Sequence, residues 1–171
     1  TNVISITDGQ IFLESDLFNA GMRPAVNVGL SVSRVGGAAQ TKAMKKAAGS
    51  IRIDLAQYRE MEVFTQFSSD LDAITKEQLE YGKRLMELLK QPLSEPLSLH
   101  AQVITLCAAT HKLFLDVPVK ELKKFQKDML AYLDQKHPQI GEEIEELHSL
   151  SDTLINKIID AVKEYKSQVV K

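Results

Sequence analysis

Arg34 is the residue whose type and position most favour chemistry on a phosphate group. It follows an alternating segment that carries Ser31 and Ser33 on one side, and Gly36 and Gly37 come shortly after it. An arginine at the end of a strand can direct a planar group of five N–H donors toward phosphate oxygens. Because such arginines also commonly face water, the spacing alone leaves both roles open for Arg34.

The sequence lacks the motifs that would bind a nucleotide phosphate. Neither G-x-x-x-x-G-K-[ST] nor G-x-G-x-x-G occurs, so we expect this chain alone to hold no nucleotide and to hydrolyse no ATP. The four histidines are too scattered to form a metal-binding pair, and the glutamates of 142–146 suit the exposed N-terminal part of a helix. Cys107 is the single cysteine and lies among apolar residues, which indicates a buried, unreactive thiol. No metal site is predicted.

Composition excludes two further classes of function. The chain has 171 residues, of which 44% are hydrophobic and 26% charged, as in ordinary soluble domains. A net charge of −2, spread along the chain, predicts no nucleic-acid binding. No apolar run approaches the roughly 20 residues that cross a bilayer, so direct membrane insertion is not expected either.

The residue pattern and turn signals of residues 1–40 are typical of short strands. Strands are expected over residues 3–6, 10–13 and 26–33. The first two would form a hairpin around Asp8-Gly9, and a brief helix capped by Ser15-Asp16 would end at Gly21. Gly36-Gly37 would end the last strand. Because these strands leave edges unpaired, their neighbours must lie upstream or in another chain, and we expect the chain to be a fragment.

Residues 41–171 have the periodicity of a helical bundle. Helices are expected to begin near residues 44, 75, 98, 118, 138 and 151. The first should bend at Gly49, a capping box at 75–78 should open the second, and residues 98–115 should form a central helix that is apolar on nearly all sides. The predicted fold is therefore mostly α, with the terminal strands of an α/β domain at 1–40 and a helical bundle at 41–171.

The segment from Pro24 to Ser33 resembles the signature P-[AS]-[LIV]-[DN]-x-x-x-S-x-S of rotary ATP synthase alpha and beta subunits. The alpha subunit in particular is similar to R-V-G-G-A-A-Q from Arg34, V-I-S-I-T-D-G-Q-I from Val3, L-A-Q-Y-R-E at 55–60 and L-L-K-Q at 88–91. The acidic motif of the beta subunit's helical domain, similar to D-E-L-S-E-E-D, is absent. The resemblance covers the whole chain. It implies the end of a RecA-like nucleotide-binding domain followed by the C-terminal helical domain of an F-type alpha subunit.

The resemblance also implies roles for particular residues. Arg34 matches the arginine finger that reaches across an interface to the γ-phosphate on a neighbouring beta subunit. Ser31 matches a signature serine treated as required for activity, and Ser5 matches a serine near the phosphate of the same shared site. The residues that match the adenine contacts of the alpha subunit's own non-catalytic site are Arg23, Pro24 and Gln91.

Two positions qualify the match. Where many family members carry a second glutamine, two residues after Gln91, this chain has Leu93. Asp70 and Asp72 fall in the loop that approaches the rotating shaft in the family, although solvated acids near a helix start are an equally good interpretation.

For the intact complex, the resemblance implies ATP or ADP with Mg²⁺ as ligands, and beta subunits, the central-stalk gamma subunit and the peripheral stalk as partners. The expected location is peripheral to an energy-coupling membrane, at the cytoplasmic face of a bacterial plasma membrane. Two alternatives stay open: a stand-alone helical interaction module, and an RNA-dependent hexameric relative, which 6% aromatic residues and a slightly acidic balance disfavour.

Overall fold

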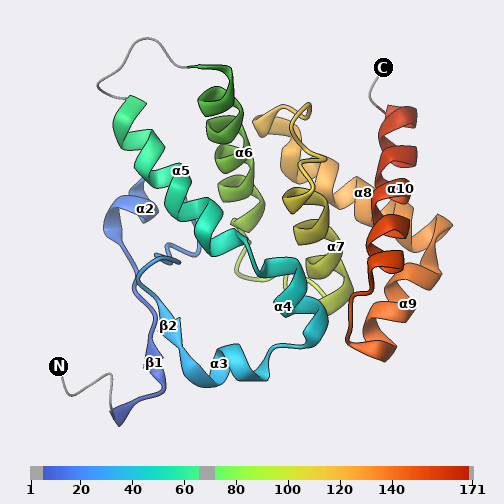
Figure 1. Ribbon diagram of the computed structural model, residues 1–171, viewed down its shortest axis with the longest axis horizontal. Helices are drawn as coiled ribbons and strands as arrows, with labels where there is room; N and C mark the ends of the chain where they lie inside the picture. Colours follow the sequence, from blue (N-terminus) through green and yellow to red (C-terminus); the bar gives the residue numbers. More distant parts are fainter. Residues whose placement is uncertain (1–5, 66–71, 170–171) are drawn as a thin grey trace.

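The computed structural model describes residues 6–65 and 72–169, in which an irregular N-terminal segment lies beside a bundle of helices (Figure 1). The N-terminal segment contains β1 (Gly9–Gln10), α2 (Ser15–Asn19), β2 (Val32–Ser33) and α3 (Arg34–Ala39). The bundle contains α4 (Lys42–Ala48), α5 (Ile51–Thr65), α6 (Ala73–Leu89), α7 (Leu99–Thr110), the 3₁₀ turn η1 (Val119–Glu121), α8 (Leu122–Lys136), α9 (Pro138–Leu147) and α10 (Asp152–Val169). The mostly helical fold class is confirmed.

The two short strands pair with each other across a long loop. They run antiparallel, with Gly9 opposite Ser33 and Gln10 opposite Val32. The hairpin expected around Asp8-Gly9 is therefore wrong, because Gly9 itself belongs to a strand whose partner comes from the far end of the segment. Residues 3–5 of the expected first strand lie outside the described residues. A Cβ at Gly9 would collide with the backbone of Val32, so only glycine allows this close pairing.

The continuous strand expected over residues 26–33 is also wrong. Asn27 is buried at 3% exposure, and its side-chain oxygen accepts a hydrogen bond from the N–H of Leu30 at 3.0 Å. The N–H of Ser31 donates to the Asn27 carbonyl oxygen at 3.0 Å, which closes a turn at 28–30. An asparagine side chain that bonds to nearby backbone competes with a sheet ladder, and here that local alternative interrupts the alternating pattern.

The step from β2 into α3 differs from the expected end at Gly36-Gly37. The strand ends at Ser33, whose hydroxyl accepts a hydrogen bond from the N–H of Gly36 at 2.8 Å and so caps α3. Both glycines lie inside this short helix. The brief helix α2 occurs where expected, but it begins after Glu14 without a side-chain cap.

The bundle follows the sequence pattern more closely. The helical stretch that begins at α4 breaks at Gly49 and resumes at Ile51, which confirms the expected bend. Helix α6 begins earlier than the predicted capping box, because the carboxylate of Asp72 accepts the N–H of Thr75 at 2.6 Å. The expected helix over 98–115 ends at Thr110.

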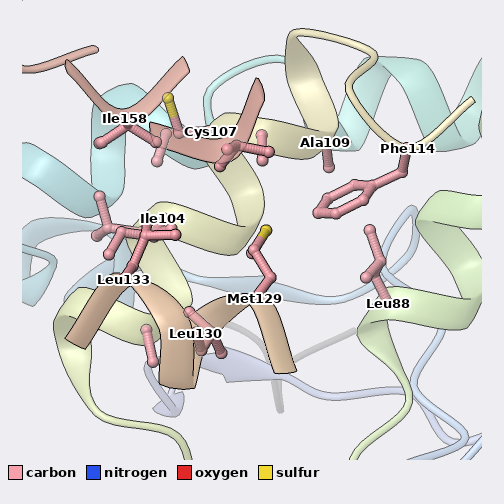
Figure 2. Packing of buried hydrophobic residues seen from close by; sticks show 14 of the residues in the cluster. Leu88, Ile104, Cys107, Ala109, Phe114, Met129, Leu130, Leu133 and Ile158 are labelled. Carbon is pink, nitrogen blue, oxygen red and sulfur yellow. The ribbon is translucent and has the colours of Figure 1, made fainter. Parts of the chain in front are cut away.

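Helix α7 lies at the centre of the core, as its apolar composition predicts, and packs against α4, α9 and α10. Beyond its C-terminus the polypeptide turns and places Phe114 inside, near Leu88 and Met129 (Figure 2). Phe114 meets Phe125 of α8 edge to face, with ring centroids 5.9 Å apart. Helices α5 and α6 form an adjacent pair, and Arg52 of α5 donates to the carbonyl oxygen of Gly29 in the N-terminal segment at 2.8 Å.

Candidate functional site

Arg34 is exposed at the first position of α3, directly after β2. Its backbone N–H donates to the carbonyl oxygen of Asp8 at 3.1 Å, and its Nη2 donates to the carbonyl oxygen of Thr7 at 3.2 Å. The backbone at Arg34 is thus held by the strand pairing, while its side chain reaches the surface. This placement is compatible with a guanidinium that acts on a group outside this polypeptide.

Asp8 fixes the turn that carries Arg34. Its carboxylate accepts hydrogen bonds from the hydroxyl of Ser33 at 2.6 Å and from the N–H of Val35 at 2.7 Å. The Ser33 hydroxyl, the Val35 N–H and the nearby charge of Arg34 lower the pKa of the Asp8 carboxyl below its ordinary value of 3.8. An ionised Asp8 therefore anchors the N-terminal end of α3.

We expect this anchor to fail in acid. A carboxyl whose pKa is lower in the folded than in the unfolded state stabilises the fold above its unfolded pKa, and this contribution is lost as pH falls through the folded pKa. The amides of Val35 and Gly36 should therefore lose protection from exchange as pH falls below 3.8 and through the lower folded pKa of Asp8, while amides of α7 stay protected. Asp8→Asn should abolish the pH step in hydrogen exchange; an unchanged step would contradict the anchoring role.

The hydroxyl of Ser31 holds the backbone of its own turn. It donates to the carbonyl oxygen of Asn27 at 2.6 Å and accepts the N–H of Phe12 at 3.0 Å. Both hydrogen-bonding functions of Ser31 are therefore engaged with backbone. Ser5 lies outside the described residues.

Arg23 and Gln91, far apart in sequence, come together at the boundary between the N-terminal segment and the bundle. The N–H of Gln91 donates to the carbonyl oxygen of Arg23 at 2.9 Å. The guanidinium carbon of Arg23 lies 4.5 Å from the centroid of the Phe18 ring, a cation–π contact that orients the side chain. Pro24 follows Arg23 through a cis peptide bond.

A cleft of about 860 Å³ opens beside these residues and is lined by Arg23 and Gln91. This volume is within the range of small-molecule sites. The side chain of Gln91 donates to the carbonyl oxygen of Glu95 at 3.3 Å, which leaves its own amide oxygen available to a ligand. Leu93 is fully exposed and does not line the cleft, so it gives no replacement for the second glutamine of the family.

Arg23, Pro24 and Gln91 form one corner at this cleft, and their chemistry suits a flat heterocycle. A guanidinium can stack on a ring, and an amide can pair with ring nitrogens. Within residues 6–65 and 72–169, no group of three or more His, Cys, Asp or Glu could hold a metal ion.

The remaining candidates have structural roles. Cys107 is buried, and burial raises the pKa of its thiol to about 11, as expected for an unreactive cysteine. Glu143 pairs with Lys157 at 3.0 Å and Glu145 with His100 at 2.7 Å. Asp72 caps α6, and Asp70 lies outside the described residues.

Across the described ranges, no helix combines the length and apolar character that a bilayer crossing requires.

Two features of these sites could not be predicted from the sequence: the support of Arg34 by Asp8, and the lysines that line the cleft. The motif around Asp8 indicates only a turn, and its partners Ser33 and Val35 cannot be identified from the sequence because they lie far along it. Lys124 and Lys127 line the cleft from α8. Their spacing of three on one helix is a signal for a shared face, but nothing in the sequence indicates that a cleft lies there.

Comparison with known proteins gives consistent family matches over nearly all of the sequence. The family model for the C-terminal domain of the ATP synthase alpha/beta chain matches residues 40–165, and that for the nucleotide-binding domain of the ATP synthase alpha/beta family matches residues 1–33. Similar proteins include ATP synthase subunit alpha of Clostridium kluyveri, 55% identical over 97% of this chain and 33% of the relative. The subunit alpha proteins of Thermobifida fusca and Aquifex aeolicus are 56% and 54% identical, over 97% and 99% of this chain and 30% and 34% of their own lengths.

The chain thus spans about a third of the length of these curated relatives. Its similarity to alpha subunits extends over both the N-terminal segment and the helical bundle, and this confirms the resemblance found in its sequence motifs. The protein belongs to the ATP synthase alpha/beta family.

Proposed function

We propose that this chain is the C-terminal part of an F-type ATP synthase alpha subunit and contributes an arginine to a catalytic site on a neighbouring beta subunit. The observation that carries this proposal is the similarity to subunit alpha proteins over 97% of the sequence. The same similarity favours neither a stand-alone interaction module nor an RNA-dependent relative. The reaction would be ATP synthesis and hydrolysis coupled to proton transport.

Arg34 is the residue that would act in this reaction. Phosphoryl transfer spreads negative charge over the transferred group, and a cation supplied from a neighbouring subunit stabilises that charge. The exposed side chain on an anchored turn supports this role, because the base of the side chain is fixed while its donors remain near the surface. Turnover of assembled complexes that carry Arg34 variants tests the assignment.

The corner formed by Arg23, Pro24 and Gln91 would hold the adenine of the alpha subunit's own non-catalytic nucleotide. The phosphates and Mg²⁺ of that ATP or ADP would be held by other parts of the nucleotide-binding domain. The resident Mg²⁺ would neutralise phosphate charge, and the residues of this chain would orient the base.

Replacing Gln91 should weaken this nucleotide site without disturbing the bundle. In a complete alpha subunit, we expect Gln91→Ala to weaken ATP binding about fivefold, the equivalent of one hydrogen bond to the base. The measurement is calorimetric titration with ATP, and the matched control is Gln139→Ala, which changes an exposed side chain of α9. Unchanged ATP affinity in Gln91→Ala, with a normal unfolding curve, would contradict the adenine assignment.

The exposed apolar surface of the N-terminal segment supports membership of a larger domain. Ile11 is 71% exposed, Leu13 70% and Val35 64%, which is unusual for three large apolar side chains in one short segment. We propose that they pack against the rest of the nucleotide-binding domain.

In the complex, the partners would be beta subunits, the gamma subunit and the peripheral stalk. The location would be peripheral to an energy-coupling membrane, such as the cytoplasmic face of a bacterial plasma membrane.

A further inference from the structure

The cleft beside Gln91 has a second wall that the proposed adenine site does not use. The first two turns of α8 form this wall and present Lys123, Lys124 and Lys127 to the cleft. Residues three and four positions apart lie on one face of a helix, so these ammonium groups form a continuous cationic surface. Lys90 adds a further positive charge from the facing loop.

Acidic side chains do not neutralise this surface. Glu95 and Asp134 are the carboxylates that line the cleft. The Asp134 carboxylate lies 3.6 Å from the imidazole of His100, and Lys90 is paired with Glu87 at 2.6 Å. The α8 wall therefore retains an excess of positive charge.

Two of the lysines keep all their donors available. Lys123 is engaged, since it donates to the carbonyl oxygen of Leu88 at 2.8 Å and to the side chain of Gln126 at 3.1 Å. Lys124 and Lys127 are exposed, and neither has a hydrogen bond or ion pair with any residue in the described ranges. Each offers three unused N–H donors to an anion.

Between the lysines and the 90–98 loop, the cleft has an apolar floor. Leu130 is 9% exposed and Ala101 8%, and Pro96 and Leu97 line the opposite side. A ligand that placed only a charged group here would leave these apolar surfaces wet. A ligand with a flat apolar body and peripheral negative charges would match both the floor and the lysines.

We propose that this cleft binds a small organic polyanion, whose flat apolar body lies on Leu130 and Ala101 while its anionic groups pair with Lys124 and Lys127. The volume of about 860 Å³ suits a ligand of a few fused rings rather than a folded protein or a nucleic-acid strand. Lys124 and Lys127 give this site a preference for anionic ligands that the corner formed by Arg23 and Gln91 does not determine.

The test uses the 171-residue protein and pyranine, a flat hydroxypyrene with three sulfonates. Fluorescence anisotropy should show saturable binding, and amide resonances of Leu130 and Ala101 should shift on titration. The double variant Lys124→Gln, Lys127→Gln should bind pyranine about tenfold more weakly, because two ion pairs in a partly open cleft are lost. Inorganic phosphate should displace pyranine poorly, because it has no apolar body.

A matched control separates this site from general attraction to positive charge. Lys42→Gln, Lys163→Gln removes two exposed lysines that do not line the cleft, and it should leave pyranine affinity within about twofold. An equal loss in both double variants, no loss in the α8 variant, or shifts confined to residues outside the cleft would each overturn the proposal. Displacement by phosphate at equal concentration would overturn the requirement for an apolar body.

Discussion

Arg34→Lys is expected to lower multisite ATP turnover of an assembled complex by about 10³-fold or more, although it preserves the positive charge. Lysine is a point charge on a flexible stem and cannot present the planar fork of donors that spans two phosphoryl oxygens. Arg34→Ala should be at least as severe. Assembly should remain intact. The backbone N–H of Arg34 donates to the carbonyl oxygen of Asp8 with any side chain at this position, and the hydrogen bond from the guanidinium to the Thr7 carbonyl oxygen lies at the surface.

The informative comparison is between turnover and nucleotide affinity. A group that acts mainly on the transition state lowers turnover while it changes ground-state binding little. Steady-state turnover and equilibrium ADP binding at the beta site should therefore separate in both variants. Arg52→Lys is a matched control, since Arg52 is exposed and donates to the carbonyl oxygen of Gly29 at 2.8 Å, and its turnover should be close to the unmodified complex. Equal losses of affinity and turnover in Arg34→Ala would show a binding or structural role instead.

The helical bundle was the predictable part of this fold because its signals are local. Caps at Thr41 and Ser98, the break at Gly49 and the proline at the start of α9 all act within a few residues. The prediction that a capping box at 75–78 opens α6 was wrong, and the reason is equally local. Asp72 is the stronger cap just upstream of it, and both patterns are present in the sequence.

The N-terminal segment was less predictable because long-range contacts decide it. The alternation of 26–33 fits a strand, but burial of Asn27 and its hydrogen bonds to Leu30 and Glu14 favour a turn. No local signal pairs Gly9 with Ser33. The exposed position of Arg34 after a strand was predicted from its neighbours, whereas the support from Asp8 depends on the same long-range pairing and was not.

The cleft, too, could be predicted from the sequence only in part. Family motifs selected Arg23 and Gln91 separately, and the structure joins them through one backbone hydrogen bond. The cationic wall of α8 had no counterpart in any motif. Its lysines have the spacing of an ordinary solvated helix face, and only the position of the 90–98 loop opposite them makes that face one wall of a cleft.

Gly82→Ala in α6 is expected to destabilise the fold by about 3 kcal/mol, despite the better helix propensity of alanine. Gly82 is buried where α6 crosses α5, and an added Cβ would collide with the ring of Tyr58 and lie 2.6 Å from its Cβ. The Cβ of Tyr58 is attached directly to the α5 backbone and cannot rotate away, so the two helices must separate. This separation would also expose the apolar contacts that hold the α5–α6 pair together.

The control for this prediction is Gly141→Ala in α9. An added Cβ at Gly141 would have its nearest contact at 3.4 Å, to the imidazole of His100, which is an ordinary van der Waals distance. Because alanine is favoured over glycine inside a helix by up to about 1 kcal/mol, Gly141→Ala should be neutral or stabilising. Thermal unfolding of the isolated protein should therefore show a fall of roughly 10 °C for Gly82→Ala and no fall for Gly141→Ala. If Gly82→Ala unfolded at the same temperature as the unmodified protein, the close crossing of α5 and α6 at Tyr58 would be wrong.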